Sequence, residues 1–189
     1  MKKLKMPVRA LCEGALLVAL AMVLNEIKLF RLPNGGSITL EMLPIFVYAL
    51  RWGVGPGVLA GLVFGALQMV LDGAIAWGWQ SLLLDYLLAF PPLGLAGLFR
   101  GKEWGVFVGS AIGALGRFAV HFISGVTIYA ITVPTEIFSV TCTSPALYSL
   151  LYNGSYMLIN TVLCMVVLAL MMVSPLKTYL LGTDLRRKA

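Results

Sequence analysis

The sequence predicts an all-α integral membrane protein, a six-helix transmembrane bundle that forms a single domain over residues 1–189 with both termini in the cytoplasm. Three observations support this fold class. Hydrophobic residues make up 60% of the chain and charged residues only 12%, about half the charged fraction of a globular protein. Six apolar runs are separated by short polar or glycine-containing segments. Lysine and arginine are concentrated in alternate segments, as expected for cytoplasmic loops.

The first apolar run is predicted to span the membrane from Val8 to Glu26, since a spanning helix needs about 20 predominantly apolar residues. Its basic start and the small residues around 19–21 also resemble a signal peptide with a cleavage site. We expect the segment to be retained, because the apolar run continues to Leu24 and further spans follow it. A polar loop from Lys28 to Glu41 comes next, with a turn signal at residues 33–36.

Five further apolar runs are predicted to be helices. In chain order they extend from Met42 to Leu50, from Gly53 to Leu71, from Gln80 to Phe99, from Trp104 to Thr132 and from Pro145 to Val173. The first of these is short for a full crossing, and the fourth is long enough to be tilted. Pro56 suits the first turn of its helix, whereas Pro91 and Pro92 are expected to kink theirs. A loop is predicted from Val133 to Ser144.

The orientation of the bundle follows from the positive-inside rule. Lys28 and Arg31 fall outside when the N-terminus is placed inside, and Arg117 lies within a span. The other eleven of the 14 basic residues are then cytoplasmic: Lys2, Lys3, Lys5, Arg9, Arg51, Arg100, Lys102, Lys177, Arg186, Arg187 and Lys188. The basic residues follow membrane topology, so the net charge of +6 does not indicate nucleic-acid binding.

Small residues recur at four-residue spacing, which allows close approach of helices in lipid. Gly57, Gly61 and Gly65 give two such steps in one run, and Gly109 and Gly113 give one in another. We expect these glycines to pack within the bundle. Ala15 and Ala19 form a weaker version on the first helix.

Asp85 is the most informative residue of the chain. It is the only charged residue between Asp72 and Arg100, and a carboxylate in hydrocarbon costs several kcal/mol. Tyr86 follows it, and Trp77 and Trp79 precede it, so the surroundings suit a small, flat organic cation. The alternative is a carboxylate satisfied by a helix–helix hydrogen bond.

His121 and Asn153 come from other predicted helices but are expected at the same outer depth as Asp85. Helical rise places each of them in the outer half of the membrane. Arg117 lies one turn from His121, so both can face the same direction. Each has a structural alternative: His121 as a satisfied interior histidine, Arg117 as the counter-charge of Asp85 or a donor to carbonyls, and Asn153 as a link between helices. The aromatic residues at this depth are Tyr129, Tyr148 and Tyr152, which also fit an interfacial belt.

Catalysis and metal binding are not supported by the sequence. His121 has no serine or cysteine partner in a recognised pattern and cannot form a metal site alone. Cys12, Cys142 and Cys164 fall in different segments, so neither a disulfide framework nor a metal spacing is predicted. The chain has no Walker motif and is not expected to hydrolyse ATP by itself.

At these residues the sequence resembles the thiamine-specific substrate-binding subunit, or S component, of energy-coupling factor (ECF) transporters. The resemblance covers almost the whole chain. The most specific stretches are Leu84–Phe90 continuing to Phe99, His121–Gly125 with Tyr129, and Tyr148 with Asn153 and Gly154; Pro44 and the stretch Arg51–Gly57 also fit.

The resemblance implies a six-helix bundle that binds thiamine near the outer face, beneath the first loop. The implied binding residues are Asp85, Tyr86, His121, Gly125, Tyr129, Tyr148 and Asn153, and we add Arg117 to this set from its position. Ala15 and Ala19 would form the face that docks on the coupling subunit. This sequence has aspartate where glutamate is frequent, Tyr129 where a stacking tryptophan is expected, and no tryptophan between Lys28 and Glu41.

The sequence therefore predicts the thiamine-binding subunit of an ECF vitamin importer in the bacterial plasma membrane. Thiamine is the ligand, and no cofactor, metal or catalytic residue is predicted. The expected partners are a coupling transmembrane subunit and two ATPase subunits. The alternatives are an S component for another vitamin and, from a different class, a membrane-embedded enzyme that uses Asp85 and His121 as acid and base.

Overall fold

The computed structural model describes residues 6–32, 36–71, 78–128 and 135–186. Within these ranges five helical segments are long and apolar enough to cross a membrane. They are α1 (Val8–Glu26), α3 (Val54–Leu71), the composite segment Trp79–Phe99, α5 (Glu103–Ile128) and α6 (Pro145–Val173). The remaining predicted run forms α2 (Met42–Trp52), an apolar helix of 11 residues.

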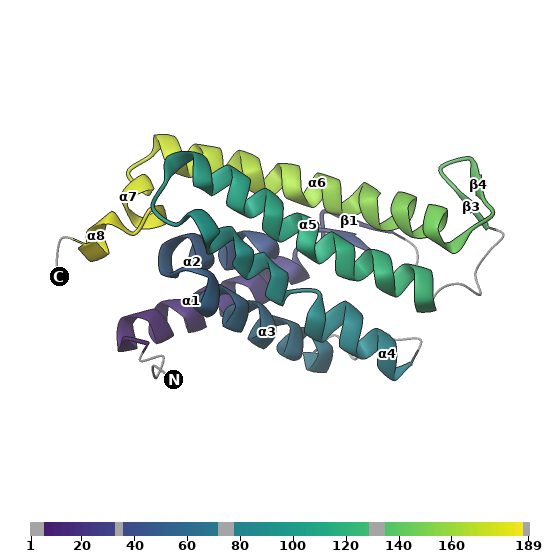
Figure 1. Cartoon of the computed structure of the whole chain (residues 1–189), viewed down its shortest axis with the longest axis horizontal. Helices are drawn as coiled ribbons and strands as arrows, with labels where there is room; N and C mark the ends of the chain where they lie inside the picture. The colour runs from purple at the N-terminus through teal and green to yellow at the C-terminus, as the bar shows by residue number, and fades with distance from the viewer. Residues whose placement is uncertain (1–5, 33–35, 72–77, 129–134, 187–189) are drawn as a thin grey trace.

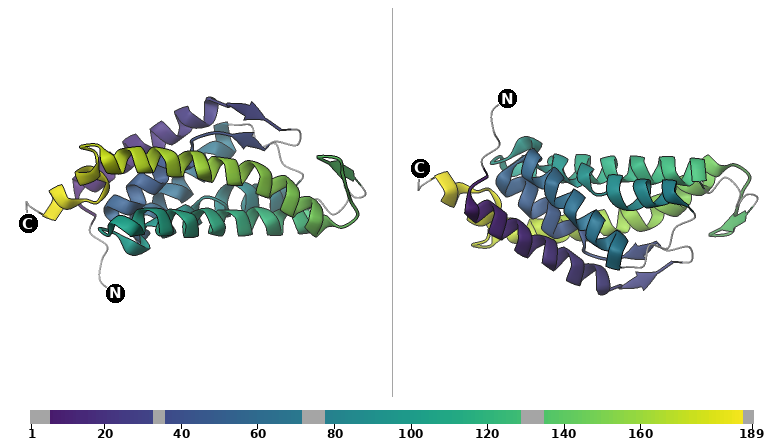
Figure 2. Two further views of the ribbon diagram at one scale, coloured as in Figure 1. Left: turned by 90° about the horizontal axis from the view of Figure 1, so that it is seen from above. Right: turned by 90° about the horizontal axis from the view of Figure 1, so that it is seen from below.

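The helices lie roughly along the long axis of the molecule, with α5 and α6 side by side on one flank and α1 and α3 on the other (Figures 1 and 2). The start of α1 lies at the same end as the two short C-terminal helices, α7 (Lys177–Leu180) and α8 (Thr183–Arg186). The short strands and α4 (Trp79–Ser81) lie toward the opposite end. The candidate site described below is on that opposite side.

The short helix α2 forms much of the core of the bundle. Its residues from Ile45 to Arg51 are all buried, and they pack against α1, α3 and the C-terminal end of the composite segment. A helix that is apolar on every face is stable when it is surrounded by other helices, and α2 has this pattern. The short second run is therefore a central helix of the structure.

The glycines at four-residue spacing lie where the backbone of a neighbouring segment comes close to the helix. The prediction that they pack within the bundle is confirmed. A Cβ atom on Gly61 would lie 2.4 Å from the carbonyl oxygen of Phe90, and one on Gly65 would lie 2.2 Å from that of Tyr86. On α5, a Cβ on Gly109 would meet the Ala96 carbonyl oxygen at 2.3 Å. Both α3 and α5 thus pack directly on the backbone of the composite segment.

The composite segment changes helix type along its length. After α4 it continues as a π-helix, η2 (Leu82–Leu88), and then as a 3-10 helix, η3 (Pro91–Phe99). The predicted kink at the two prolines is therefore a change of helical geometry. Proline lacks a backbone donor and restricts the residue before it, so the regular α-helical ladder cannot pass through Phe90.

Both loops that carry short strands form antiparallel hairpins. In the first loop β1 (Phe30–Arg31) pairs with β2 (Ser37–Ile38), and residues 33–35 of the predicted turn lie outside the described residues. In the last loop β3 (Thr135–Ile137) pairs with β4 (Val140–Cys142), a hairpin that the sequence analysis did not predict. Phe138 and Ser139 connect these two strands with positive φ values of 50° and 62°.

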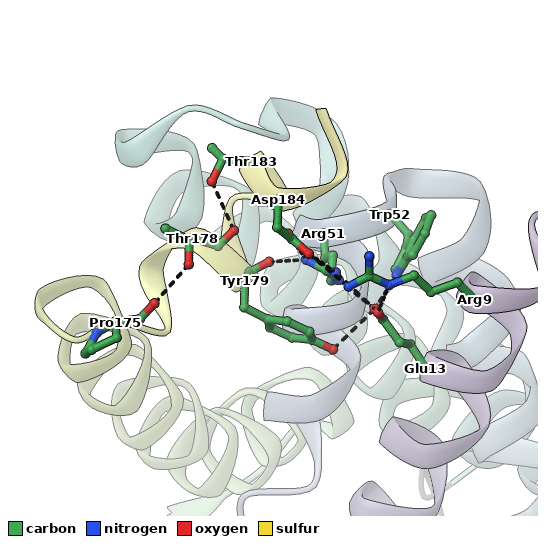
Figure 3. Close-up of polar contacts among 9 residues, drawn as sticks. All are labelled: Arg9, Glu13, Arg51, Trp52, Pro175, Thr178, Tyr179, Thr183 and Asp184. Atoms are coloured by element: carbon green, nitrogen blue, oxygen red, sulfur yellow. Dashed lines mark hydrogen bonds and ion pairs between the residues drawn. The ribbon is translucent and has the colours of Figure 1, made fainter. Parts of the chain in front are cut away.

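A polar cluster joins the start of α1, the end of α2 and the C-terminal helices (Figure 3). We call it the Arg51 cluster; it consists of Arg9, Glu13, Arg51, Trp52, Tyr179 and Asp184. The Arg51 side chain is 0% exposed and lies 3.9 Å from the centre of the Tyr179 ring. Glu13 of α1 accepts hydrogen bonds from Arg51, Arg9 and the Trp52 indole. The cluster therefore connects α1 to the end of the chain.

Candidate functional site

Asp85 and His121 lie together in the structure, as the shared predicted depth suggested. His121 Nδ1 is 3.3 Å from Asp85 Oδ1, and Ser81 Oγ donates to Asp85 Oδ2 over 2.7 Å. Asp85 lies on the π-helix η2, a wide turn that is often found at functional sites. The π-helix and α5 thus present an acid and an imidazole to each other.

Arg117 is held by a carboxylate that sequence reasoning did not select. Its Nη2 donates to Oε1 of Glu41 over 2.6 Å, and its guanidinium carbon lies 4.2 Å from the centre of the Phe90 ring. The proposed alternatives for Arg117 were Asp85 and backbone carbonyls; Glu41, at the start of α2, is the ion partner that the structure gives it. Glu41 was assigned to the end of the first loop, but it is buried.

The hydrogen bonds around His121 favour one tautomer. Arg117 Nε is a donor and lies 3.5 Å from His121 Nε2, so Nε2 acts as the acceptor. The ring proton is then on Nδ1, where it donates to Asp85. With a neutral imidazole, the two carboxylates of Asp85 and Glu41 and the one guanidinium of Arg117 leave one negative charge uncompensated.

The hydrogen-bond chain continues from Glu41 to the first helix. Gln68 Nε2 on α3 is 3.5 Å from Glu41 Oε2 and 3.0 Å from Asn25 Oδ1 at the end of α1. All three side chains are buried. A lone amide in the apolar run of α3 is the signal that could have identified Gln68, because it is the same signal that identified Asp85.

Asn153 links α6 to α5. Its Nδ2 donates to the His121 carbonyl oxygen at 3.1 Å and to Ser149 Oγ at 3.0 Å, and Tyr156 donates to its Oδ1. The bond to His121 joins the two helices, as the structural alternative for Asn153 expected, and the bonds to Ser149 and Tyr156 lie within α6. Gly125 allows the contact, since a Cβ there would lie 2.3 Å from Ser149 Oγ.

Tyr148 and the first loop meet on α6. Tyr148 is buried and stacks on Tyr152 with a centroid distance of 5.7 Å. The Tyr152 hydroxyl accepts from the Gly36 backbone over 2.9 Å. Asn160, which sequence reasoning missed, bonds the backbone of Ser37 and Thr39, both at 3.0 Å. The β1–β2 hairpin is thereby fixed to α6.

Tyr86 follows Asp85 on η2 and is half-buried, whereas Trp79 is exposed at the start of α4. Tyr129 and Trp77 were also predicted near the site, and both lie outside the described residues. Among the described residues no group of histidine, cysteine, aspartate and glutamate side chains could hold a metal ion.

Ala15 and Ala19 are exposed on α1, next to the buried residues Gly14 and Val18. They border a groove of about 360 Å³ between α1 and α3. Its lining is apolar: Met6, Leu11, Gly14, Ala15, Val18, Ala19, Tyr48, Pro56, Leu59, Ala60, Val63 and Leu67. The four-residue alanine spacing thus lies at an open, apolar surface.

The sequence of this chain is similar to known proteins over nearly its whole length. Residues 11–180 match the family described as "Thiamine transporter protein (Thia_YuaJ)". The chain is 34% identical over 176 residues to the thiamine transporter ThiT of Bacillus subtilis (strain 168), covering 85% of this chain and 88% of the relative. It is 32% identical over 179 residues to the thiamine transporter ThiT of Lacticaseibacillus paracasei, covering 85% of each.

The fold is similar to a solved structure of ThiT from Listeria monocytogenes. The TM-score is 0.76, with 24% identity, and the match covers 91% of this chain and 97% of the other. The structural similarity shows the fold. The family match and the two sequence relatives show the family to which the chain belongs. The chain therefore belongs to the thiamine transporter family, with a role in transport rather than catalysis, and is a multi-pass bacterial membrane protein.

Proposed function

We propose that this chain is the thiamine-binding subunit of an ECF importer, which captures thiamine at the outer face of the plasma membrane. The observation that carries the proposal is the group formed by the partly buried Asp85 and His121 and the buried Arg117 and Glu41, with one uncompensated negative charge. Thiamine is a permanent monocation with two aromatic rings, so a site with one excess negative charge and neighbouring aromatic faces complements it.

The proposed site uses residues from three helical segments. Asp85 and Tyr86 on η2 face the ligand amine or cation, and His121 and Gly125 on α5 lie beside its rings. Tyr148 and Asn153 on α6 set the orientation, and Tyr129, which lies outside the described residues, is the proposed stacking residue. Arg117 supports this group through His121.

The proposed topology has six spans in one domain with both termini in the cytoplasm. Short helix α2 is the second span, surrounded by the others, and the Arg51 cluster lies at the cytoplasmic end. This arrangement puts the β1–β2 hairpin and η2 toward the outer face, where a vitamin enters. It is supported by the distribution of basic residues, eleven of which then face inside.

Energy for transport would come from partner proteins, since the sequence has no ATP-binding loop. We propose that a helix of the coupling transmembrane subunit docks at Ala15 and Ala19, and that two ATPase subunits drive delivery of the vitamin. The exposed, apolar groove beside these alanines supports close helix contact there.

Titration calorimetry of the purified protein tests the proposal. Thiamine should bind with one-to-one stoichiometry, and mass spectrometry should recover it unaltered from the complex. Riboflavin and biotin, titrated in parallel, should give no heat. Binding of another vitamin in preference to thiamine would replace the ligand assignment, and recovery of a converted product would instead support an enzyme.

A further inference from the structure

Arg117 presents a physical problem in a site for a cation. Arg117 is buried, and its guanidinium lies 3.5 Å from the ring of His121, which in turn contacts Asp85. A buried cation at this position repels a cationic ligand, because solvent screening is weak inside the protein. An arginine here is compatible with thiamine only if another group cancels its charge.

Glu41 is placed to cancel it. Its Oε1 accepts from Arg117 Nη2 at 2.6 Å, and both side chains are 6% exposed. Glu41 is also held in place by other elements: Gln68 on α3 donates to its Oε2, and its backbone nitrogen donates to Thr39 Oγ1. The carboxylate is thus fixed opposite the guanidinium.

Arg117 also retains an unused donor. Its Nη1 is buried and has no hydrogen-bond partner among the residues that the structure describes. Buried donors of purely structural groups are almost always satisfied. The free nitrogen therefore indicates that Arg117 serves an acceptor from outside the described residues, while Glu41 removes the cost of its charge.

We propose that Glu41 determines the charge specificity of the site: by neutralising Arg117 it lets Asp85 present a single net negative charge to a monocationic ligand. The inference rests on the proposed function, since the monocation is thiamine. The charge balance of Asp85, Glu41 and Arg117 makes it testable. The sum is one negative charge in the wild type, zero in Glu41→Gln, two negative in Arg117→Gln, and one negative again in the double variant.

The experiment measures two affinities for each variant by calorimetry. One ligand is thiamine, and the other is a neutral analogue in which a thiophene ring replaces the thiazolium. The ratio of the two affinities reports the preference for positive charge. A merely structural role of Glu41 would weaken both ligands together and leave this ratio unchanged.

Glu41→Gln should lower the cation preference by about tenfold to a hundredfold, the effect of one charged partner. The Glu41→Gln/Arg117→Gln double variant should return the ratio to near the wild-type value, and Arg117→Gln alone should keep or increase it. The control is Glu103→Gln, which removes a carboxylate 18 positions before His121 on α5, outside the site. It should leave the ratio unchanged.

An unchanged ratio in Glu41→Gln, or a double variant with no recovery, would overturn the proposal. If Glu41→Gln does not fold, the comparison of Arg117→Gln with the wild type decides: a fall in cation preference on removing the arginine would contradict the charge balance. Failure of the wild type to bind thiamine would instead reject the proposed function itself, so the two failures are distinguishable.

Discussion

Arg51 and Asp184 form a two-pronged ion pair across most of the chain. Arg51 Nη1 donates to Asp184 Oδ1 over 2.7 Å, and Nη2 donates to Oδ2 over 2.8 Å. Such parallel bonds fix geometry as well as charge. Since Arg9 also binds Asp184 at 2.9 Å, the last helix of the described chain holds the first one, and with it the face that carries Ala15 and Ala19.

Asp184→Asn should destabilise the protein by about 1 kcal/mol, because the buried Arg51 loses one of its two ionised partners and keeps Glu13, while the partial exposure of Asp184 reduces the cost. Thermal unfolding in detergent measures the change. Thiamine affinity should be unaltered, since the cluster lies at the far end of the bundle from η2. The matched control is Lys177→Met, which breaks the more exposed Glu103–Lys177 pair and should cost less than about 0.5 kcal/mol.

The same pair gives the stability a dependence on pH. The hydrogen bonds from Arg51, together with the charge of Arg9, hold the pKa of Asp184 below its usual range. A carboxyl with a lowered pKa in the folded state stabilises the protein fully above its unfolded pKa of about 3.9. This stabilisation is lost as pH falls further, through the folded value. The melting temperatures of wild type and Asp184→Asn should therefore converge below about pH 4; a constant difference would show that the pair contributes no linked protonation.

Asp85→Asn should weaken thiamine binding by about 1–3 kcal/mol, the range for a charged hydrogen-bond partner. The variant keeps the shape of the side chain but removes its charge, and Ser81 and His121 can still contact it. Calorimetric titration measures the loss. Ser81→Ala serves as a comparison, because it removes one bond to Asp85 and leaves the charge; it should have the smaller effect. Equal affinities for Asp85→Asn and wild type would assign Asp85 a structural role.

Gly125→Ala should weaken thiamine binding and lower stability by about 1–3 kcal/mol, the cost of overpacking a close contact. The added methyl group would lie 2.3 Å from Ser149 Oγ and 3.1 Å from Asn153 Nδ2, so α5 and α6 must separate. The control is Gly154→Ala on α6, where the nearest atom belongs to Phe118 at 3.9 Å. This variant should be neutral or slightly more stable, since alanine favours the helix. Equal effects of the two substitutions would contradict the packing argument.

Replacement of both Ala15 and Ala19 by tryptophan should abolish assembly with the coupling subunit, because two large rings cannot fit a close helix crossing. Thiamine binding by the isolated subunit should survive, since the proposed pocket lies on η2, α5 and α6. Co-purification and calorimetry are measured on the same variant. Leu16→Trp is the control, because Leu16 is 71% exposed on α1 but does not line the groove. Loss of binding along with assembly would show that the alanines support the bundle itself.

The ends of the helices were predictable where local signals mark them. The predicted bounds Val8–Glu26 and Pro145–Val173 coincide with α1 and α6. Pro7 and Pro145 mark the starts of these helices, and the sequence changes from apolar to polar residues where they end. The π-helix at residues 82–88 was not predictable, because its sequence is an ordinary apolar helical run. Helix type here depends on packing against Gly65 and α5, which sequence periodicity does not reveal.

Within the site, the sequence identified the groups but not their pairing. Asp85 and His121 were selected by polarity and depth alone, and they are in contact. The partner of Arg117 was missed, because Glu41 stands at a loop boundary, where a carboxylate is unremarkable. Arg51 was likewise counted as a cytoplasmic charge, although its side chain is fully buried. Burial and pairing of these residues depend on which helix ends meet in space, and this is a tertiary property.

The wide turn that carries Asp85 makes the length of this segment as important as its composition. A π-turn holds one more residue than an α-turn, so removing one residue between Leu82 and Leu88 would let this wide turn close into an α-turn and change the position of Asp85 within it. Asp85 would then leave the face that meets His121, although no side chain of α5 or α6 had changed. Insertion or deletion of a single residue here would therefore change the direction of the Asp85 side chain relative to α5 without any substitution in the segment.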